Sequence, residues 1–113
     1  MKIVNTENSE HYKWGNDADG WHLLESEELS IIEENMPPNE KEQRHYHSLS
    51  QQFFYVLAGV AHLEISGNVF EIHAGSGIHV PAKEPRQLMN TGTVNLRFLV
   101  VSQPKSHGDR VSA

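Results

Sequence analysis

The sequence contains no cysteine, which excludes disulfide scaffolds, cysteine-based zinc sites and cysteine nucleophiles. It also has no long hydrophobic run. The longest apolar stretch, residues 53–58, is far shorter than the roughly 20 residues that span a bilayer, and the first residues do not begin a signal peptide. We therefore expect a cytoplasmic protein with no membrane partner.

Basic residues are scarce as well. The 113 residues include 9 Lys and Arg against 15 Asp and Glu, which gives a formal net charge of −6. A nucleic-acid partner would need a surplus of positive charge to displace counterions from the phosphates. The charge balance thus argues against nucleic acid. A chain of this length is expected to fold as one domain, residues 1–113, around one core.

Apolar residues recur at every second position in short runs, and glycine, proline and asparagine separate the runs. This period is typical of strands with one buried face. Strands are expected over residues 21–24, 29–36, 43–47, 53–57, 61–65, 69–72, 77–80, 86–89 and 96–101. No segment has a sustained helical repeat, so the pattern predicts an all-β sandwich or barrel. We expect the barrel to cover about residues 20–102, with the polar segments 1–19 and 103–113 peripheral to it.

The main chemical signal is His45-Tyr46-His47. On a strand, residues two apart point to the same face with Cα atoms about 7 Å apart, so both imidazoles can bind one metal ion. Because the sequence has 8 histidines, two solvated strand histidines are an equally good interpretation of this pattern alone.

The spacing around this pair resembles the two motifs of the cupin family, and the resemblance covers residues 39–90. The first motif is matched by His45, His47 and Gly59, while Asn39 replaces its first glycine and Gln52 its glutamate. The second is matched by Gly75, Pro81 and Asn90, while Lys83 replaces a glycine and Arg86 the histidine. The resemblance implies a cupin-type double-stranded β-helix, a jelly-roll barrel with a central metal pocket.

Two of the replacements fall on positions where the family has metal ligands, so the resemblance implies a reduced set of His45, His47 and, weakly, Gln52. A guanidinium about 5 Å from a divalent ion would repel it by roughly 7 kcal/mol at an effective dielectric constant of 20. We expect no metal, or one divalent Fe, Mn, Ni or Zn ion held weakly. The repulsion would vanish if Arg86 turned away or an anionic ligand lay between the cations. A third alternative is that His79 supplies the missing imidazole.

Arg86 itself has two interpretations. It can reach solvent or pair with Glu84, or its planar fork can bind a carboxylate or phosphate inside the barrel. If Gln52 faces inward, strand alternation turns Phe54 inward too, and Leu88 shares the face of Arg86. The predicted ligand site therefore consists of Arg86, His45, His47, Gln52, Phe54 and Leu88.

The remaining polar and aromatic residues are interpreted as structural. Five histidines with polar neighbours are expected at the surface: His11, His22, His62, His73 and His107. Trp14 and Trp21 are expected to cover a barrel end or a dimer seam. Adjacent strand residues point to opposite faces, so Glu33 and Glu34 cannot act together on a substrate, and we interpret them as solvated. An outward apolar face is predicted for Tyr46, Phe53, Tyr55 and Leu57, which favours a homodimer.

Three functions follow. The favoured one is a barrel that binds a small anionic or sugar-like ligand with weak or absent metal. The alternative is a metal-dependent enzyme, of the dioxygenase or sugar-isomerase type that the family resemblance implies, using His45 and His47. The third is a sensory or structural barrel without chemistry. Whether the protein is an enzyme is left open by the sequence.

Overall fold

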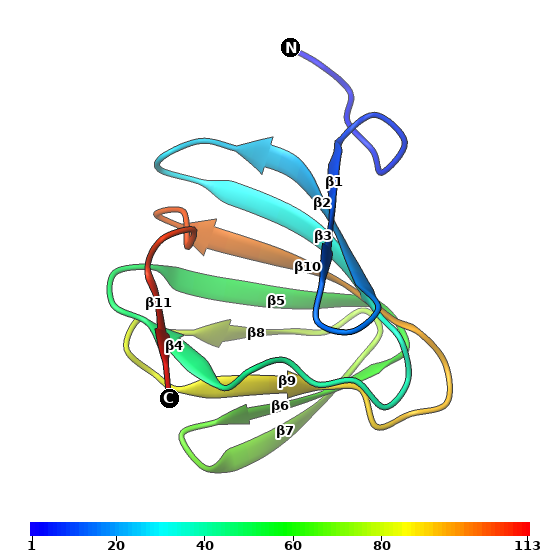
Figure 1. The fold of residues 1–113 in the computed structure, drawn as a ribbon, viewed down its shortest axis with the longest axis vertical. Coiled ribbons are helices and arrows are strands. Elements are labelled where there is room, and N and C mark those ends of the chain that lie inside the picture. Colours follow the sequence, from blue (N-terminus) through cyan, green and yellow to red (C-terminus); the bar gives the residue numbers. More distant parts are fainter.

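The structure is a computed structural model that describes all residues 1–113, and it consists of strands without any helix (Figure 1). The strands are β1 (Glu10–Trp14), β2 (Ala18–Glu25), β3 (Ser30–Met36), β4 (His45–His47), β5 (Gln51–Ala58), β6 (Val60–Ile65), β7 (Asn68–His73), β8 (Gly77–Val80), β9 (Arg86–Met89), β10 (Leu96–Gln103) and β11 (Arg110–Ser112). No helix has the length and apolar character that crossing a membrane would require.

The strands form two antiparallel sheets that face each other across the interior (Figure 1). One sheet has the order β1-β2-β3-β10-β5-β8 and the other the order β11-β4-β9-β6-β7. Neighbours in each sheet are often far apart in the sequence, since β10 lies between β3 and β5, and β9 lies between β4 and β6. The all-β jelly-roll prediction is confirmed.

The core lies between the two sheets and is built by strand alternation. On β5, residues Gln52, Phe54 and Val56 are buried while their neighbours are exposed. On β10, buried residues alternate with mostly partly buried ones. The buried apolar cluster consists of Met36, Phe54, Val56, Ala61, Leu63, Ile72, Val80, Leu88, Leu96, Phe98 and Val100. The opposite face of β5 exposes Phe53, Tyr55 and Leu57, as predicted, whereas Tyr46 is partly buried.

The motif residues shape the loops at the ends of the barrel. Asn39 and Lys83, which replace glycines of the motifs, have positive φ values of 68° and 72°. Gly59 has a φ of 82°, and a Cβ atom there would lie 2.7 Å from the carbonyl oxygen of Asn95. The side-chain amide of Asn90 donates to the carbonyl oxygens of Met36 and Val94, both at 2.9 Å. These residues therefore hold the chain's turns, independently of any ligand.

Parts of the two polar end segments join the sheets, which differs from the expectation that both segments are peripheral. Strand β1 pairs with β2, and β11 pairs with β4, so each segment extends a sheet. The register of β1 places Tyr12 opposite Gly20, where a Cβ atom would lie 2.2 Å from the tyrosine ring. Neither strand carries an apolar run, and each is fixed by a partner strand rather than by its own pattern.

Candidate ligand-binding cavity

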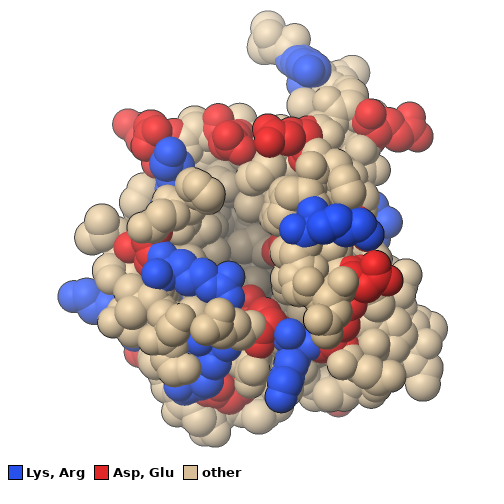
Figure 2. Space-filling view, viewed as in Figure 1, with Lys and Arg blue, Asp and Glu red and all other residues tan.

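A cavity of about 610 Å³ opens between the two sheets. In the space-filling view, the face toward the viewer is hollowed at its centre, and side chains of both charges lie around the hollow (Figure 2). One wall comes from β1, β2 and β3, and the other from β4, the segment before it and residues 105–110. Phe54 and Val100 are among the apolar residues of the lining. The volume suits a small molecule.

His45 and His47 lie side by side on β4 and line the cavity, with ring centroids 4.9 Å apart and ring planes at 81°. Nδ1 of His45 lies 2.8 Å from the carbonyl oxygen of Gln43, and Nδ1 of His47 lies 3.3 Å from that of Asp109. A carbonyl oxygen only accepts, so these contacts assign the proton of each ring to Nδ1. Nε2 of each ring therefore carries a lone pair and has no partner in the protein.

Burial keeps both imidazoles neutral. It lowers the pKa of His45 to about 4, and the positive charges of Arg110 and Arg86 act in the same direction. Burial also lowers the pKa of His47 to about 4, with Arg86 as the next cause. At neutral pH the two rings thus offer acceptor nitrogens and no positive charge.

Arg86 is fully buried but does not line the cavity. Its Nη2 donates to Oε1 of Gln52, and its Nη1 donates to the carbonyl oxygen of Glu84 at 3.2 Å. The Gln52 amide in turn donates to Oγ of Ser102 at 3.0 Å. The fork therefore binds the protein's own amide instead of an anion in the cavity. The expectation that Arg86 reaches solvent is wrong, and its contact with Glu84 is to the backbone carbonyl rather than to the carboxylate.

Of the other predicted site residues, some line the cavity and some do not. His45, His47, Gln52 and Phe54 line the cavity, as expected from strand alternation. Leu88 is buried in the core and does not line it. His79 is exposed, and its Nε2 contacts Oε1 of Gln51 at 2.9 Å, so the alternative in which it completes a metal site is wrong.

The donor set does not fit a complete metal centre of the family type. His45 and His47 present free Nε2 atoms, but the amide oxygen of Gln52 is taken by Arg86. No group of three or more His, Asp or Glu side chains is arranged to hold a metal ion. The two imidazoles lack the third ligand that such a site needs, and the adjacent buried guanidinium repels a divalent ion.

Glu34 was interpreted as solvated, and this is wrong, because its side chain points into the cavity from β3. The hydroxyl of Tyr12, on β1, donates to Oε2 of Glu34 at 3.2 Å. Burial, followed by the nearby Glu42 carboxylate, raises the pKa of Glu34 to about 8. Its neighbour Glu33 points to the other face and accepts from Nε of Arg97 at 2.7 Å. The inward turn of Glu34 follows from parity with the buried Ser30 and Met36.

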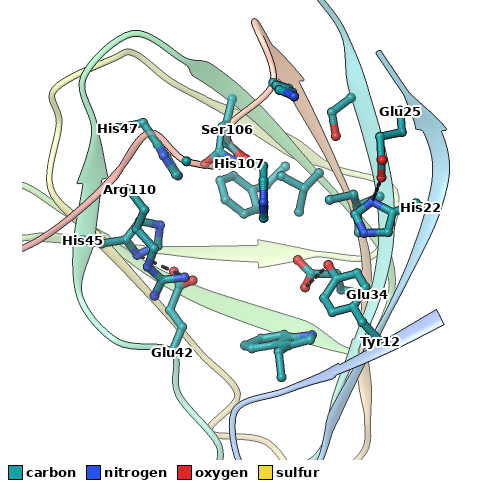
Figure 3. A pocket seen from close by; sticks show the side chains of 18 of the residues that line it. Tyr12, His22, Glu25, Glu34, Glu42, His45, His47, Ser106, His107 and Arg110 are labelled. Atoms are coloured by element: carbon teal, nitrogen blue, oxygen red, sulfur yellow. Dashed lines mark hydrogen bonds and ion pairs between the residues drawn. The ribbon is translucent and has the colours of Figure 1, made fainter. Parts of the chain in front are cut away.

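Glu42 faces Glu34 across the cavity, on the side of His45 and Arg110 (Figure 3). The backbone N–H of Leu88 donates to its Oε2 at 2.8 Å, and its Oε1 lies 3.9 Å from Nδ1 of His45. Burial raises the pKa of Glu42 to about 7, although the Leu88 hydrogen bond and two arginines oppose the rise. No motif predicted this residue.

The C-terminal segment closes one side of the cavity with Lys105, His107 and Arg110. It is attached through Asp109, whose carboxylate accepts the backbone N–H groups of residues 48, 49 and 50 at 3.1, 2.9 and 2.8 Å. Burial acts to raise the pKa of Asp109, but these donors lower it below its usual value. Sequence periodicity could not find this wall because the segment has no apolar run.

Two of the histidines expected at the surface also line the cavity. His107 is exposed, as expected, whereas His22 is partly buried, so the expectation is wrong for His22. Nδ1 of His22 lies 3.0 Å from Oε2 of Glu25, and its ring packs 4.9 Å from that of Tyr12. Trp14 lines the cavity too, and its Nε1 donates to the carbonyl oxygen of Asp19 at 3.0 Å. The N-terminal strands thus supply a complete wall.

The fold and the cavity define a small jelly-roll barrel with an internal polar pocket. The family model described as a cupin domain matches residues 32–102. This match covers more than half of the chain, and the protein therefore belongs to the cupin family. The motif resemblance is confirmed.

The individual proteins that the chain resembles share about a third of the aligned residues with it or fewer. An uncharacterised protein of Methanocaldococcus jannaschii is 33% identical over 81 residues, which are 71% of this chain and 65% of that protein, slightly less than two thirds of its length. The structure of the polyketide cyclase RemF from Streptomyces resistomycificus matches this one with a TM-score of 0.86 at 21% sequence identity. The match covers 100% of this chain and 85% of the RemF chain. A single-residue variant of Streptomyces PAC13 with uridine has a TM-score of 0.83 at 13% identity, covering 100% and 90%. These similarities establish the fold.

Proposed function

We propose that this cupin binds a small, hydroxyl-bearing, sugar-like molecule in its cavity, with metal held weakly or not at all. The observation that carries the proposal is the convergence of polar side chains from both sheets on one cavity of about 610 Å³. The structural neighbours that are named a polyketide cyclase and a uridine complex support a small organic molecule as the ligand class.

The charges around the cavity favour the sugar-like ligand over the anionic one. Lys105 and Arg110 are its cationic residues, but the lining also includes Glu10, Glu25, Glu34 and Glu42. Lys105 is paired with Glu27 at 2.9 Å. Arg86, which suggested an anion, is bound to Gln52. A polyol can donate to the carboxylates and imidazoles and accept from Arg110, whereas a phosphate would meet several acceptors.

The alternative is a metal-dependent enzyme using His45 and His47. One observation supports it: both rings donate Nδ1–H to a backbone carbonyl, the arrangement that orients metal-binding histidines. Metal analysis of protein purified without an affinity tag, after incubation with Fe(II), Mn(II), Ni(II) and Zn(II), separates the two functions. Stoichiometric metal of micromolar affinity or tighter would establish the alternative.

Binding is tested by calorimetric titration with D-ribose, uridine, inorganic phosphate and citrate. We expect the neutral hydroxyl-bearing probes to bind and the anions to bind more weakly. Ile32→Trp, which fills the cavity, should abolish binding, and Ile31→Trp on the other face of β3 is the matched control. If none of the probes binds the wild-type protein, the proposal fails.

We also propose that the exposed face of β5 pairs two copies of the chain. Phe53, Tyr55 and Leu57 are 41, 37 and 42% exposed on adjacent outward positions. Sedimentation of the wild type and of a variant with Tyr55→Lys and Leu57→Glu tests this. A monomeric wild-type protein at micromolar concentration would contradict it.

A further inference from the structure

Glu34 is a carboxylic acid with one oxygen left free for a ligand. It lies on β3, between β2 and β10, and its side chain reaches into the cavity beside Tyr12 (Figure 3). Oε2 accepts the hydroxyl of Tyr12 at 3.2 Å, while Oε1 has no hydrogen-bond partner in the protein. A group placed at this wall of the cavity would therefore meet Oε1.

Several charged and titratable groups surround this carboxyl. Tyr12 faces it from β1, His22 lines the same wall from β2, and Glu42 and Arg110 lie across the cavity. Burial and the Glu42 carboxylate raise the pKa of Glu34 to about 8, whereas the Tyr12 hydrogen bond and the Arg110 charge lower it. The raised pKa favours the protonated form of this carboxyl at neutral pH. Because Tyr12 already donates to Oε2, the proton belongs on Oε1, which becomes a hydrogen-bond donor.

The opposite wall offers two hydrogen-bond acceptors. Nε2 of His45 and Nε2 of His47 are acceptors, since each ring uses its Nδ1–H on a backbone carbonyl. Both rings are on the side of Glu42 and Arg110, facing Glu34 and Tyr12 (Figure 3). The cavity therefore presents the Glu34 donor at one end and two imidazole acceptors, with the Arg110 donor beside them, at the other.

We propose that the cavity takes an uncharged hydroxy-carbonyl compound, with its carbonyl oxygen bound by Oε1–H of Glu34 and its hydroxyl group donating to His45 or His47. This rests on the proposed function as a small-molecule-binding cupin and narrows its ligand class. A simple alcohol satisfies only the imidazole end. A ligand with a carbonyl at the other end satisfies both, and the Glu34 carboxyl is then fully hydrogen-bonded.

Two matched probes test the two-ended site. The first, 3-acetylbenzyl alcohol, has a hydroxyl and a carbonyl, and the second, 3-ethylbenzyl alcohol, lacks the carbonyl. Both stay uncharged across the pH range used. Calorimetric titration of the wild type at pH 6.5 should show about tenfold tighter binding of the ketone, the effect of one buried hydrogen bond.

Variants of Glu34 identify the donor. Glu34→Gln keeps an N–H donor and should retain the preference for the ketone, whereas Glu34→Ala should reduce it to less than about twofold. Glu33→Gln, on the outer face of the same strand, is the matched control and should bind like the wild type. The melting temperature of each variant checks that it is folded.

The pH dependence of probe binding provides an independent test. When the pH is raised from 6.5 to 9, the wild type should lose its preference for the ketone as Glu34 ionises, and Glu34→Gln should keep it. A preference that survives in Glu34→Ala, or equal binding of both probes by the wild type, overturns this inference and leaves the proposed function intact. If ribose, uridine and both probes all fail to bind the wild type, the proposed function itself is overturned.

Discussion

Nη2 of Arg86 donates a hydrogen bond to Oε1 of Gln52 inside the barrel, and these two residues occupy the positions where the cupin motifs have a histidine and a glutamate. The chain thus has an internal cation and an amide where the motifs have a metal ligand pair. Their contact occupies one lone pair of the only oxygen that Gln52 could offer to an ion, and it places a positive charge beside that oxygen. The pair links the sheet of β5 to the sheet of β9.

Restoring the motif residues should therefore restore metal binding. The double variant with Arg86→His and Gln52→Glu removes the guanidinium and supplies an imidazole and a carboxylate beside His45 and His47. We expect its affinity for Zn(II) or Ni(II) to exceed that of the wild type by several decades, because about five decades correspond to the 7 kcal/mol of repulsion estimated for a nearby guanidinium. Calorimetric titration of the untagged proteins measures the difference.

The single variant Gln52→Glu is the control for this experiment. It adds a carboxylate but keeps Arg86, which should pair with the new charge and leave metal affinity nearly unchanged. If the double variant binds metal no better than the wild type, the cavity histidines are not positioned to ligate, and the interpretation of Arg86 as the obstacle is wrong.

Most of the barrel, but only part of the site, could be predicted from the sequence. Strand alternation and motif spacing correctly turned His45, His47, Gln52 and Phe54 toward the interior. These predictions depend only on local parity along β4 and β5. Arg86 was also placed on the inward face, yet its long side chain ends at Gln52, and no pattern along the chain indicates the partner of a buried fork.

Tyr12 and Glu34 on one wall of the cavity, and Arg110 on the other, were missed for a different reason. Tyr12 and Arg110 reach the cavity because β1 pairs with β2 and β11 pairs with β4, and both pairings add a polar strand to the edge of a sheet. An edge strand with one face toward a polar cavity has no apolar alternation to detect. Alternation along β3 places Glu34 on the inward face. It was expected in solvent because an acidic side chain was not expected in the interior.

Truncating Arg86 should destabilise the fold. Arg86→Ala leaves a void in the interior and an unpaired Gln52 oxygen, and we expect a loss of about 3 kcal/mol in the free energy of unfolding. Arg97→Ala is the comparison, since Arg97 pairs with Glu33 at a partly exposed site and contributes about 1 kcal/mol or less. Urea denaturation measures both. Equal losses would show that the Arg86 contact is not a significant part of the core.

Acid should destabilise the protein through the two cavity histidines. Their pKa values are lowered to about 4 in the folded state, so the unfolded chain binds more protons between about pH 6.5 and pH 4. Stability is fully present above the unfolded pKa and falls as the pH drops through this window. The loss has an upper bound on the order of 3 kcal/mol for each imidazole.

A variant with His45→Asn and His47→Asn removes these titrations. Its free energy of unfolding should change less than that of the wild type between pH 7 and pH 4, and His73→Asn, an exposed site, should behave like the wild type. Parallel pH dependences for the wild type and the double variant would contradict the lowered pKa values.

Glu34 should make the stability of the fold depend on pH in the opposite direction. Its folded pKa is raised to about 8, so its favourable contribution is present below the usual carboxyl pKa and is lost as the pH rises toward 8. Glu34→Gln keeps the shape and a polar partner for Tyr12 without titrating. The variant should therefore become progressively more stable than the wild type between about pH 5 and pH 8, and the difference should level off above that.

The C-terminal wall should loosen when its attachment is removed. Asp109→Asn leaves only one acceptor oxygen for the three backbone N–H groups of residues 48–50 and adds an amide donor facing them. We expect faster hydrogen exchange at these amides and weaker binding of any ligand that contacts Arg110, while the amides of β10 stay protected. Asp17→Asn, on an exposed turn, is the control. Unchanged exchange at residues 48–50 would mean that β11 pairing with β4 alone holds the segment in place.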